Sequence, residues 1–410
     1  MFQTIPQVLR NIKMKVLGID TIRIDEYPNL LFVEIKTDEG LIGLGETFYG
    51  PMSSEAHIHE IIAPYLIGKN PLNIEKHQKN LIGYTGFVGS SAERRGASAI
   101  DIALWDIWGK ATSQPLYNLL GGKVRNKIKV YNTCAGPNYI RKLPIQGTNN
   151  FGLTSKQGKY EDLNAFLNSP VELAHSLLDM GITAMKIWPF DFAAEESQGQ
   201  YISPSNMQKS LEPFEEIRKS LGDKIDIMAE LHSLWNKPQA IKICKELEQF
   251  NLAWIEDPVF MDHLSTLRDV CKATSAPIAV GETRGGRADY RSLLELNGLA
   301  QVIMDISWGG GISEAAKVAV MAEVWHIPIA FHDCTGPVTL TASTHLALSN
   351  TNCQVQEIVR AFYYGWYENL VTDLPPIKNG YIDVPKGNGL GLSLQKDFYK
   401  RSDVHIKSSS

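Results

Sequence analysis

The sequence lacks a strong charge excess of either sign. Its 410 residues include 40 Lys and Arg against 45 Asp and Glu, which gives a formal net charge of −5 at pH 7. The basic residues are scattered, and no run of like charges marks an arm or a tail. Because nucleic acids and acidic membranes attract proteins through clustered positive charge, we expect neither as a partner.

Long apolar stretches and paired cysteines are also missing. No segment approaches the ~18 apolar residues that predict a membrane-spanning helix. The first residues, 1–16, lack the apolar core and small-residue cleavage site of a secretion signal. The five cysteines are an odd number without a CxxC pair, which favours reduced thiols over disulfides or a cysteine-ligated metal. From these absences we expect a cytoplasmic protein.

What the sequence does contain begins with an α+β pattern. Apolar and polar residues alternate in three short segments, which predicts an antiparallel meander of strands at 13–25, 31–37 and 41–47. Apolar residues at helical spacing follow over 56–66 and 92–110. We therefore expect residues 1–126 to form an α+β capping domain.

From residue 127 onward, short apolar runs alternate with amphipathic stretches. The runs lie at 128–134, 183–188, 225–230, 252–256, 277–282, 301–305, 327–332 and 352–357. Eight repeats of strand and helix predict a closed, TIM-like (β/α) barrel over residues 127–360. An open doubly wound sheet is the alternative, although no GxGxxG follows the first strand. Residues 361–410 are expected to pack back on the capping domain.

Two connections between strands and helices are unusually long, at 136–169 and 189–204. Loops of that length in a compact domain usually form a lid, an interface or a disordered segment. Both follow strands of the predicted barrel, so they belong to the face where barrel active sites lie.

Six consecutive strands end in an acid or a histidine, 23–27 residues apart: Glu230, Glu256, Glu282, Asp305, His332 and Glu357. In a barrel these ends converge on one cavity. Five carboxylates there would repel each other strongly unless a cation were present. The three adjacent glutamates offer the hard oxygen ligands of one Mg²⁺, with Mn²⁺ as the alternative. A helix cap or surface charge explains any single acid, but not the whole set in register.

Two histidines can provide acid–base chemistry at this cavity. His332 follows the strand next to the one that ends in Asp305, so a carboxylate can orient its ring and leave the other nitrogen as a general base. His232 lies two residues beyond Glu230, and strand alternation would send both side chains to the same face. A structural role is the alternative for His232.

A recognisable motif precedes the barrel. Residues 99–110 read AIDIALWDIWGK, and Pro115-Leu116 and Leu119-Leu120-Gly121-Gly122 follow at the barrel entry. This combination resembles the mandelate racemase and muconate-lactonising branch of the enolase superfamily, and the resemblance runs from about residue 13 to the C-terminus. It implies a barrel with an N-terminal α+β capping domain that the C-terminal segment completes.

The resemblance also assigns roles. Glu230, Glu256 and Glu282 match the metal-ligand positions, and Asp305 with His332 matches the catalytic dyad of the mandelate racemase subgroup. Glu357 matches the acid that hydrogen-bonds the enediolate, and the muconate-lactonising lysine is absent because Asp305 ends the sixth strand. Two residues depart from the pattern: Glu230 replaces the more frequent aspartate, and Trp188 replaces the second lysine of the racemases.

These matches imply a Mg²⁺-dependent dehydratase of a sugar acid, because Glu230 and His232 resemble the Asp-x-His of the acid-sugar dehydratases. His332 would remove the α-proton and His232 would protonate the leaving hydroxyl. Lys186 and Glu357 would bind the substrate carboxylate, with burial raising the pKa of Glu357. Trp188 and Arg284 are candidates for the distal part of the substrate, although a surface ion pair explains Arg284 equally well.

Two other functions remain open. A racemase or epimerase would share the same residues, and a non-catalytic regulatory homologue would keep only the fold, although the presence of all ligands disfavours it. In this family the capping domain contributes to specificity, which by position implicates residues 27–29 and 48–51. The expected partner is a small carboxylate substrate, a sugar acid, and we expect a homo-oligomer.

Overall fold

The structure is a computed structural model that describes residues 13–81, 91–153 and 158–410. Most of the segment considered above as a secretion signal, and residues 154–157 of the first long connection, lie outside the described residues.

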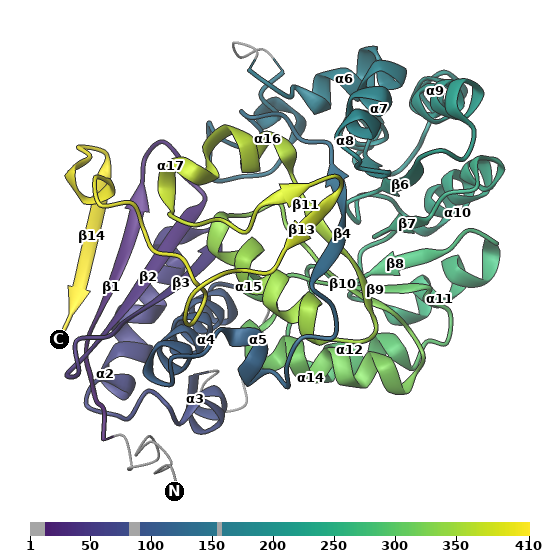
Figure 1. Cartoon of the computed structure of the whole chain (residues 1–410). Helices are drawn as coiled ribbons and strands as arrows, with labels where there is room; N and C mark the ends of the chain where they lie inside the picture. The colour runs from purple at the N-terminus through teal and green to yellow at the C-terminus, as the bar shows by residue number, and fades with distance from the viewer. Residues whose placement is uncertain (1–12, 82–90, 154–157) are drawn as a thin grey trace, which may run out of the picture.

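The N-terminal part forms the expected antiparallel sheet with helices on one side (Figure 1). Strands β1 (Val16–Ile24), β2 (Leu30–Thr37) and β3 (Ile42–Phe48) follow one another as a meander. A fourth strand, β14 (Val404–Ser409), comes from the C-terminus and pairs with β1. The helices are α1 (Pro51–His57), α2 (Ala63–Leu66), α3 (Ile74–Leu81), α4 (Ala92–Ala111) and α5 (Leu116–Leu119).

Helix α4 packs directly on β3 because two glycines leave room for its backbone. A Cβ atom on Gly43 would lie 2.1 Å from the carbonyl oxygen of Ala103, and one on Gly45 would lie 1.9 Å from that of Ala99. Any side chain would therefore push the helix off the sheet. Small residues on both elements therefore let the backbone of α4 contact the backbone of β3.

Eight parallel strands form a closed barrel. They are β4 (Lys127–Thr133), β5 (Ala184–Ile187), β6 (Asp226–Glu230), β7 (Trp254–Glu256), β8 (Ile278–Val280), β9 (Gln301–Met304), β10 (Ile329–Phe331) and β11 (Cys353–Ile358). Consecutive strands pair, and β11 returns to pair in parallel with β4. The closed barrel is confirmed, and the open doubly wound alternative is wrong because that last pairing leaves no sheet edge.

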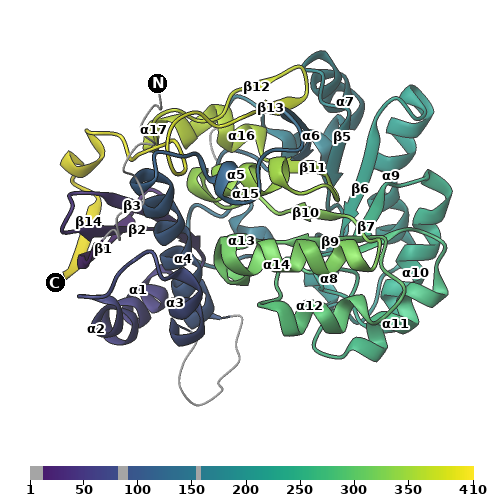
Figure 2. The ribbon, with the colours of Figure 1, turned by 60° about the horizontal axis from the view of Figure 1, so that its bottom comes forward.

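Helices surround the barrel on the outside (Figure 2). They are α7 (Pro170–Asp179), α9 (Pro204–Leu221), α10 (Lys237–Leu247), α11 (Leu264–Ala273), α12 (Arg287–Leu294), α14 (Gly311–Val324) and α15 (Pro337–Ser349). Shorter helices lie within the connections after the strands: α6 (Asp162–Asn168), α8 (Asp191–Ser197) and α13 (Ile306–Gly309). Both long connections thus contain helical structure.

The barrel interior is filled by one layer of side chains beneath the strand ends. The layer consists of Tyr131, Ala184, Met228, Trp254, Ala279, Ile303 and Ala330, all buried. Each comes from a different strand, from β4 to β10. We call this set of residues the floor layer.

The C-terminal segment contacts both parts of the molecule. After α16 (Arg360–Phe362) and α17 (Glu368–Leu370), a short hairpin of β12 (Ile377–Lys378) and β13 (Tyr381–Asp383) pairs with β4 of the barrel. Strand β14 then completes the sheet of the capping domain. The fold class is as expected, whereas the domain limits at residues 126 and 360 stay predictions.

Buried carboxylates fix the capping domain to the barrel. Glu46 in β3 accepts hydrogen bonds from the backbone N–H groups of Val338 (3.0 Å) and Thr339 (3.1 Å), at the first turn of α15. Burial raises the pKa of Glu46 to about 7, although these donors act in the opposite direction. Asp101 in α4 likewise accepts from the backbone of Ser313 in α14 at 2.9 Å. The cap therefore contacts the helices that follow β9 and β10.

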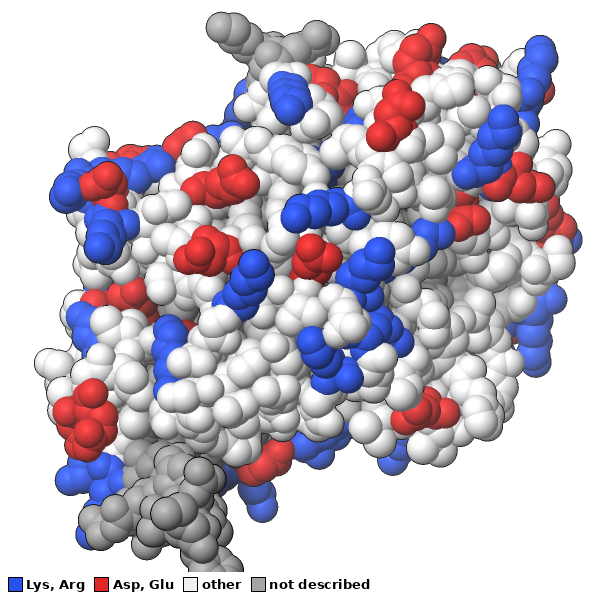
Figure 3. Space-filling view, in the orientation of Figure 1, with Lys and Arg blue, Asp and Glu red and all other residues white. Residues whose placement is uncertain are grey.

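The remaining expectations concern the surface and the cysteines. All five cysteines lie in described segments and are free thiols. Across the part of the chain that the structure describes, every helix is too short or too polar to cross a bilayer. On the face in Figure 3, acidic and basic side chains both occur, separated by large uncharged areas.

Candidate active site

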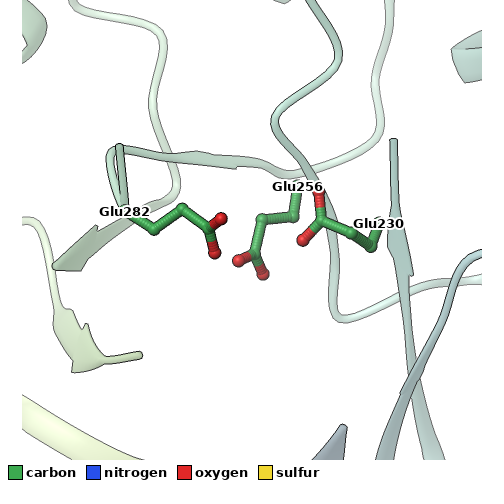
Figure 4. Close-up of side chains that lie close together, drawn as sticks. All are labelled: Glu230, Glu256 and Glu282. Atoms are coloured by element: carbon green, nitrogen blue, oxygen red, sulfur yellow. The ribbon is translucent and has the colours of Figure 1, made fainter. Parts of the chain in front are cut away.

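The three glutamates expected as metal ligands lie together at the strand ends. Glu230 ends β6, Glu256 ends β7, and Glu282 follows β8 by two residues. One oxygen from each can be chosen so that all three lie within 4.8 Å of one another. Figure 4 shows the carboxylates of Glu282 and Glu256 directed toward each other, with Glu230 beyond Glu256. Parallel strands bring these ends into register, as the sequence spacing predicted.

Lys186 of β5 balances part of this negative charge. Its Nζ lies 2.7 Å from Glu256 Oε1, 3.1 Å from Glu357 Oε1 and 3.2 Å from Glu230 Oε2. Burial lowers the pKa of the Lys186 ammonium, but these carboxylates outweigh that effect and raise it well above the usual value. Lys186 is therefore a fixed cation beside the glutamates.

The donor set fits a hard divalent cation. Burial raises the pKa of Glu256 to about 8, and the charges of Glu230 and Glu357 act in the same direction. The charge of Lys186 acts in the opposite direction but does not outweigh the effect of burial on this pKa. Oxygen Oε2 of Glu230 is buried and accepts no hydrogen bond from the described residues, although Lys186 Nζ lies 3.2 Å away. Carboxylate oxygens in this arrangement are the ligands that Mg²⁺ and Mn²⁺ prefer.

His332 and Asp305 form the expected pair. His332 Nδ1 lies 2.8 Å from Asp305 Oδ2, and both residues are buried. The other oxygen of Asp305 accepts hydrogen bonds from the backbone N–H groups of Ser307 (2.7 Å) and Trp308 (3.1 Å), at the start of α13. Asp305 is thus both a helix cap and the partner of a histidine, which the sequence analysis treated as alternatives.

The second ring nitrogen of His332 faces the cavity. Nε2 lies 3.2 Å from Glu282 Oε2, and the ring of Trp308 packs against the imidazole with centroids 5.0 Å apart. Burial lowers the pKa of His332, but Glu282, Glu357 and Asp305 together raise it well above its usual value. A cation among the glutamates would oppose this effect, because positive charge disfavours the imidazolium.

His232 also faces the cavity, but for a different reason than strand alternation. Strand β6 ends at Glu230, and the backbone of His232 is left-handed with φ 48°. Two contacts hold it there: its N–H donates to Glu230 Oε1, and its Nδ1 lies 2.8 Å from Asp191 Oδ2. His232 and Glu230 therefore line the same cavity, as expected, but a left-handed turn and not strand alternation sets the direction of the His232 ring.

Asp191 is a site residue that the sequence analysis missed. It begins α8 in the second long connection and is buried. Burial lowers the pKa of His232, but Asp191 and Glu230 raise it to about 10. The length of the 189–204 connection was the signal that this segment contributes to the site. The cavity therefore has two histidines, each paired with an aspartate.

The pKa of Glu357 differs from the expectation. Burial was expected to raise the pKa of its carboxyl, and burial does act in that direction. Lys186 and His332 act against burial, together with hydrogen bonds from the Thr133 hydroxyl and the Asp333 backbone N–H, and they lower the pKa of Glu357 below its usual value. These two hydrogen bonds occupy both carboxylate oxygens: Oε1 accepts from Thr133 and Oε2 accepts from Asp333.

A cavity of ≈ 30 Å³ lies at these strand ends. Of the expected residues, Glu256, Asp305 and Glu357 are not among those that line it, whereas Lys186, Trp188, Glu230, His232, Glu282 and His332 are. Besides expected residues, its lining includes Tyr49, Thr133, Tyr139, Gln146, Trp308 and Cys334. Gln146 accepts a hydrogen bond from the hydroxyl of Tyr49 in the cap and donates one to that of Tyr139, both at 3.3 Å. The cap loop at 48–51 and the first long connection thus meet over the site.

The 27–29 turn, which was expected to contribute to specificity, contacts the first long connection. The amide of Asn29, in the 27–29 turn, donates to the carbonyl oxygen of Ile140 at 2.8 Å and so supports the first long connection.

Trp188 lines the cavity, and its indole N–H has no hydrogen-bond partner within the described segments. Arg284 is not among the lining residues, and its Nε lies 3.9 Å from Asp289. A role for Arg284 in substrate binding stays a prediction.

Family models match most of the chain. Residues 10–121 match the mandelate racemase and muconate lactonizing enzyme N-terminal domain. Residues 170–398 match the enolase C-terminal domain-like family. These two regions contain strands β1, β2 and β3 of the capping sheet and the residues from Lys186 to Glu357 described above.

Similar curated proteins are named as sugar-acid dehydratases. D-xylonate dehydratase of Haloferax volcanii is 28% identical over 391 residues, which cover 93% of this chain and 87% of that protein. D-galactonate dehydratase of Xanthomonas oryzae pv. oryzae is 28% identical over 384 residues, which cover 92% of this chain and 91% of that protein.

Solved structures agree with this family. A mandelate racemase subgroup enolase from Agrobacterium tumefaciens is 49% identical, with a TM-score of 0.86 over 96% of this chain and 98% of that one. An enolase protein from Sargasso Sea environmental sequencing is 38% identical, with a TM-score of 0.86 over 97% of this chain and 99% of that one. Fold, strand-end residues and comparisons together place the chain in the mandelate racemase subgroup of the enolase superfamily.

Proposed function

We propose that the protein is a Mg²⁺-dependent dehydratase that converts a sugar acid to a 2-keto-3-deoxy acid. One observation carries the proposal: His332 and His232, each paired with an aspartate, line the same cavity as Glu230 and Glu282 of the glutamate cluster. Such an arrangement can remove one proton and deliver another. The names of the curated relatives support the reaction class.

The substrate carboxylate would bind beside the glutamates. Glu230, Glu256 and Glu282 would hold the Mg²⁺, which supplies Lewis-acid stabilisation of the developing negative charge when bound. Lys186 would stabilise the same charge, because its ammonium is fixed by three carboxylates and needs no reorganisation. Glu357, with its lowered pKa, would act mainly by holding Lys186 and not as a proton donor.

His332 would take the α-proton at Nε2, the nitrogen that does not contact Asp305. The electron pair of the broken C–H bond forms the enediolate. His232 would then donate a proton to the β-hydroxyl as the C–O bond breaks, so that water leaves. Its contact with Asp191 favours the protonated ring that this role requires. The resulting enol tautomerises to the 2-keto-3-deoxy acid.

Indole groups in the cavity would recognise substrate hydroxyls. Trp188 and Trp308 are buried, with exposed fractions of 1% and 6%, and neither indole N–H has a hydrogen-bond partner among the residues described. Buried donors without partners are costly, and a polyhydroxylated ligand would satisfy them. This feature supports a sugar acid over a simple α-hydroxy acid.

Replacing Trp308 with phenylalanine tests this role. Loss of one neutral hydrogen bond of roughly 0.5–1.5 kcal/mol predicts a decrease in kcat/KM of about 2- to 12-fold. We expect the decrease mainly in KM, because phenylalanine keeps an aromatic ring beside the His332 imidazole and removes only the indole N–H. Steady-state kinetics on the wild type and the variant measure it. An unchanged kcat/KM would remove the indole N–H from substrate recognition.

The metal site has its own test. In crystals grown with Mg²⁺, we expect one ion bound by Glu230, Glu256 and Glu282, at metal–oxygen distances of about 2.0–2.1 Å. Ligands from other strands would contradict the assignment, as would the absence of an ion at saturating Mg²⁺.

An epimerase is the second candidate, because His232 and His332 could serve as opposed bases across the cavity. The two reactions are separated by screening mono- and diacid sugars for 2-keto acid formation in ²H₂O. Dehydration predicts a keto acid and loss of the β-hydroxyl. Epimerisation predicts ²H at C2 with the β-hydroxyl retained, and that result would overturn the proposed reaction.

A further inference from the structure

We propose that Trp254 is a positioning residue for the metal site: its indole N–H holds the carboxylate of Glu256 in the orientation that a divalent cation requires. This inference rests on the proposed metal ligands. Trp254 Nε1 donates a hydrogen bond to Glu256 Oε2 at 2.7 Å, and both residues are buried in β7. They are two positions apart, so they point to the same side of the strand, into the barrel.

The barrel interior is built to accept this indole. Trp254 belongs to the floor layer, where three other strands contribute the small residues Ala184, Ala279 and Ala330. Its ring meets Tyr131 edge-to-face, with centroids 5.3 Å apart and planes at 89°. A large aromatic residue among alanines fills space that would otherwise be a void. The packing fixes the ring and therefore the direction of its N–H group.

Both oxygens of Glu256 are held from different sides. Lys186 Nζ contacts Oε1 at 2.7 Å, and Trp254 Nε1 contacts Oε2 at 2.7 Å. The carboxylate plane cannot turn without breaking one of these bonds. Neither Glu230 nor Glu282 accepts an indole N–H among the described residues: Glu230 contacts the backbone of His232 and Lys186 Nζ, and Glu282 contacts the ring of His332.

The indole differs from Lys186 in charge. An ammonium that holds a carboxylate also competes electrostatically with a bound cation. A neutral N–H orients the carboxylate and leaves its negative charge available to the metal. Partners of this kind typically change metal affinity by about 10- to 100-fold when they are removed.

The test is Mg²⁺ titration of the metal-free full-length chain by calorimetry. Trp254→Phe keeps an aromatic ring in the layer but removes the N–H, and we expect Mg²⁺ to bind about 10- to 100-fold more weakly. Met228→Ala is the matched control for lost volume, because Met228 lies in the same layer without a polar group. Trp235→Phe controls for the substitution itself, because that buried indole has no hydrogen-bond partner among described residues.

We expect both control variants to bind Mg²⁺ within about threefold of the wild type, with thermal melting of each metal-free variant as the check on folding. Equal affinity of Trp254→Phe and wild type would overturn the role of Trp254. Equal weakening by Met228→Ala would assign the effect to packing and would overturn it as well. A wild-type chain that takes up no Mg²⁺ would overturn the metal site itself, and the role of Trp254 with it.

Discussion

Replacing His332 with asparagine is expected to lower turnover by about 10²–10⁴-fold, the usual contribution of a general base. The same change should remove exchange of the C2 proton with solvent. His332 is the imidazole whose second nitrogen faces the glutamates, and Asp305 holds its first nitrogen at 2.8 Å. Both rates are measured on one substrate, by keto acid formation and by loss of the C2 proton signal in ²H₂O.

Among the described residues that line the cavity, His232 and Lys186 are the other candidates for a base. Asp191 favours the protonated ring of His232, and three carboxylates raise the pKa of Lys186 well above the usual value. His326→Asn is the matched control, because His326 is exposed and its φ of 57° suits asparagine. Exchange at the wild-type rate in His332→Asn would require another base.

Replacing His232 with asparagine is expected to lower dehydration by about 10²–10⁴-fold while leaving exchange at C2 largely intact. The reason is a division of labour, in which His332 removes the proton and His232 delivers one to the leaving hydroxyl. Asp191 contacts His232 Nδ1 at 2.8 Å and favours the protonated ring. Dehydration and exchange are measured on the same variant, again with His326→Asn as the control.

The same geometry predicts that the protein does not racemise a simple α-hydroxy acid. Trp188 stands where racemases of this family have a second lysine, and an indole N–H cannot accept a proton near neutral pH.

Equal loss of dehydration and exchange in His232→Asn would mean that His232 positions substrate or metal. Unchanged dehydration would make His232 structural and would leave the acid role to His332.

The fold was predictable from the sequence because its signals are local and repeated. Eight apolar runs alternate with amphipathic segments, and a barrel is the closed arrangement that buries them all. The glutamates at 230, 256 and 282 were found for the same reason, since residues at the ends of consecutive parallel strands must lie side by side. Regular spacing along the chain becomes proximity in space without any long-range information.

Other features depended on tertiary contacts. Asp191 reaches His232 from a different connection, 41 residues away, and no periodic pattern links the two. The lowered pKa of Glu357 results from the sum of several buried charges, whose sign depends on distances that a sequence does not contain. The sequence by itself determined which groups gather at the barrel mouth, because strand register is a property of spacing. Only the tertiary structure decided how they are paired and charged, because hydrogen bonds and buried electrostatics depend on angstrom-scale contacts between distant segments.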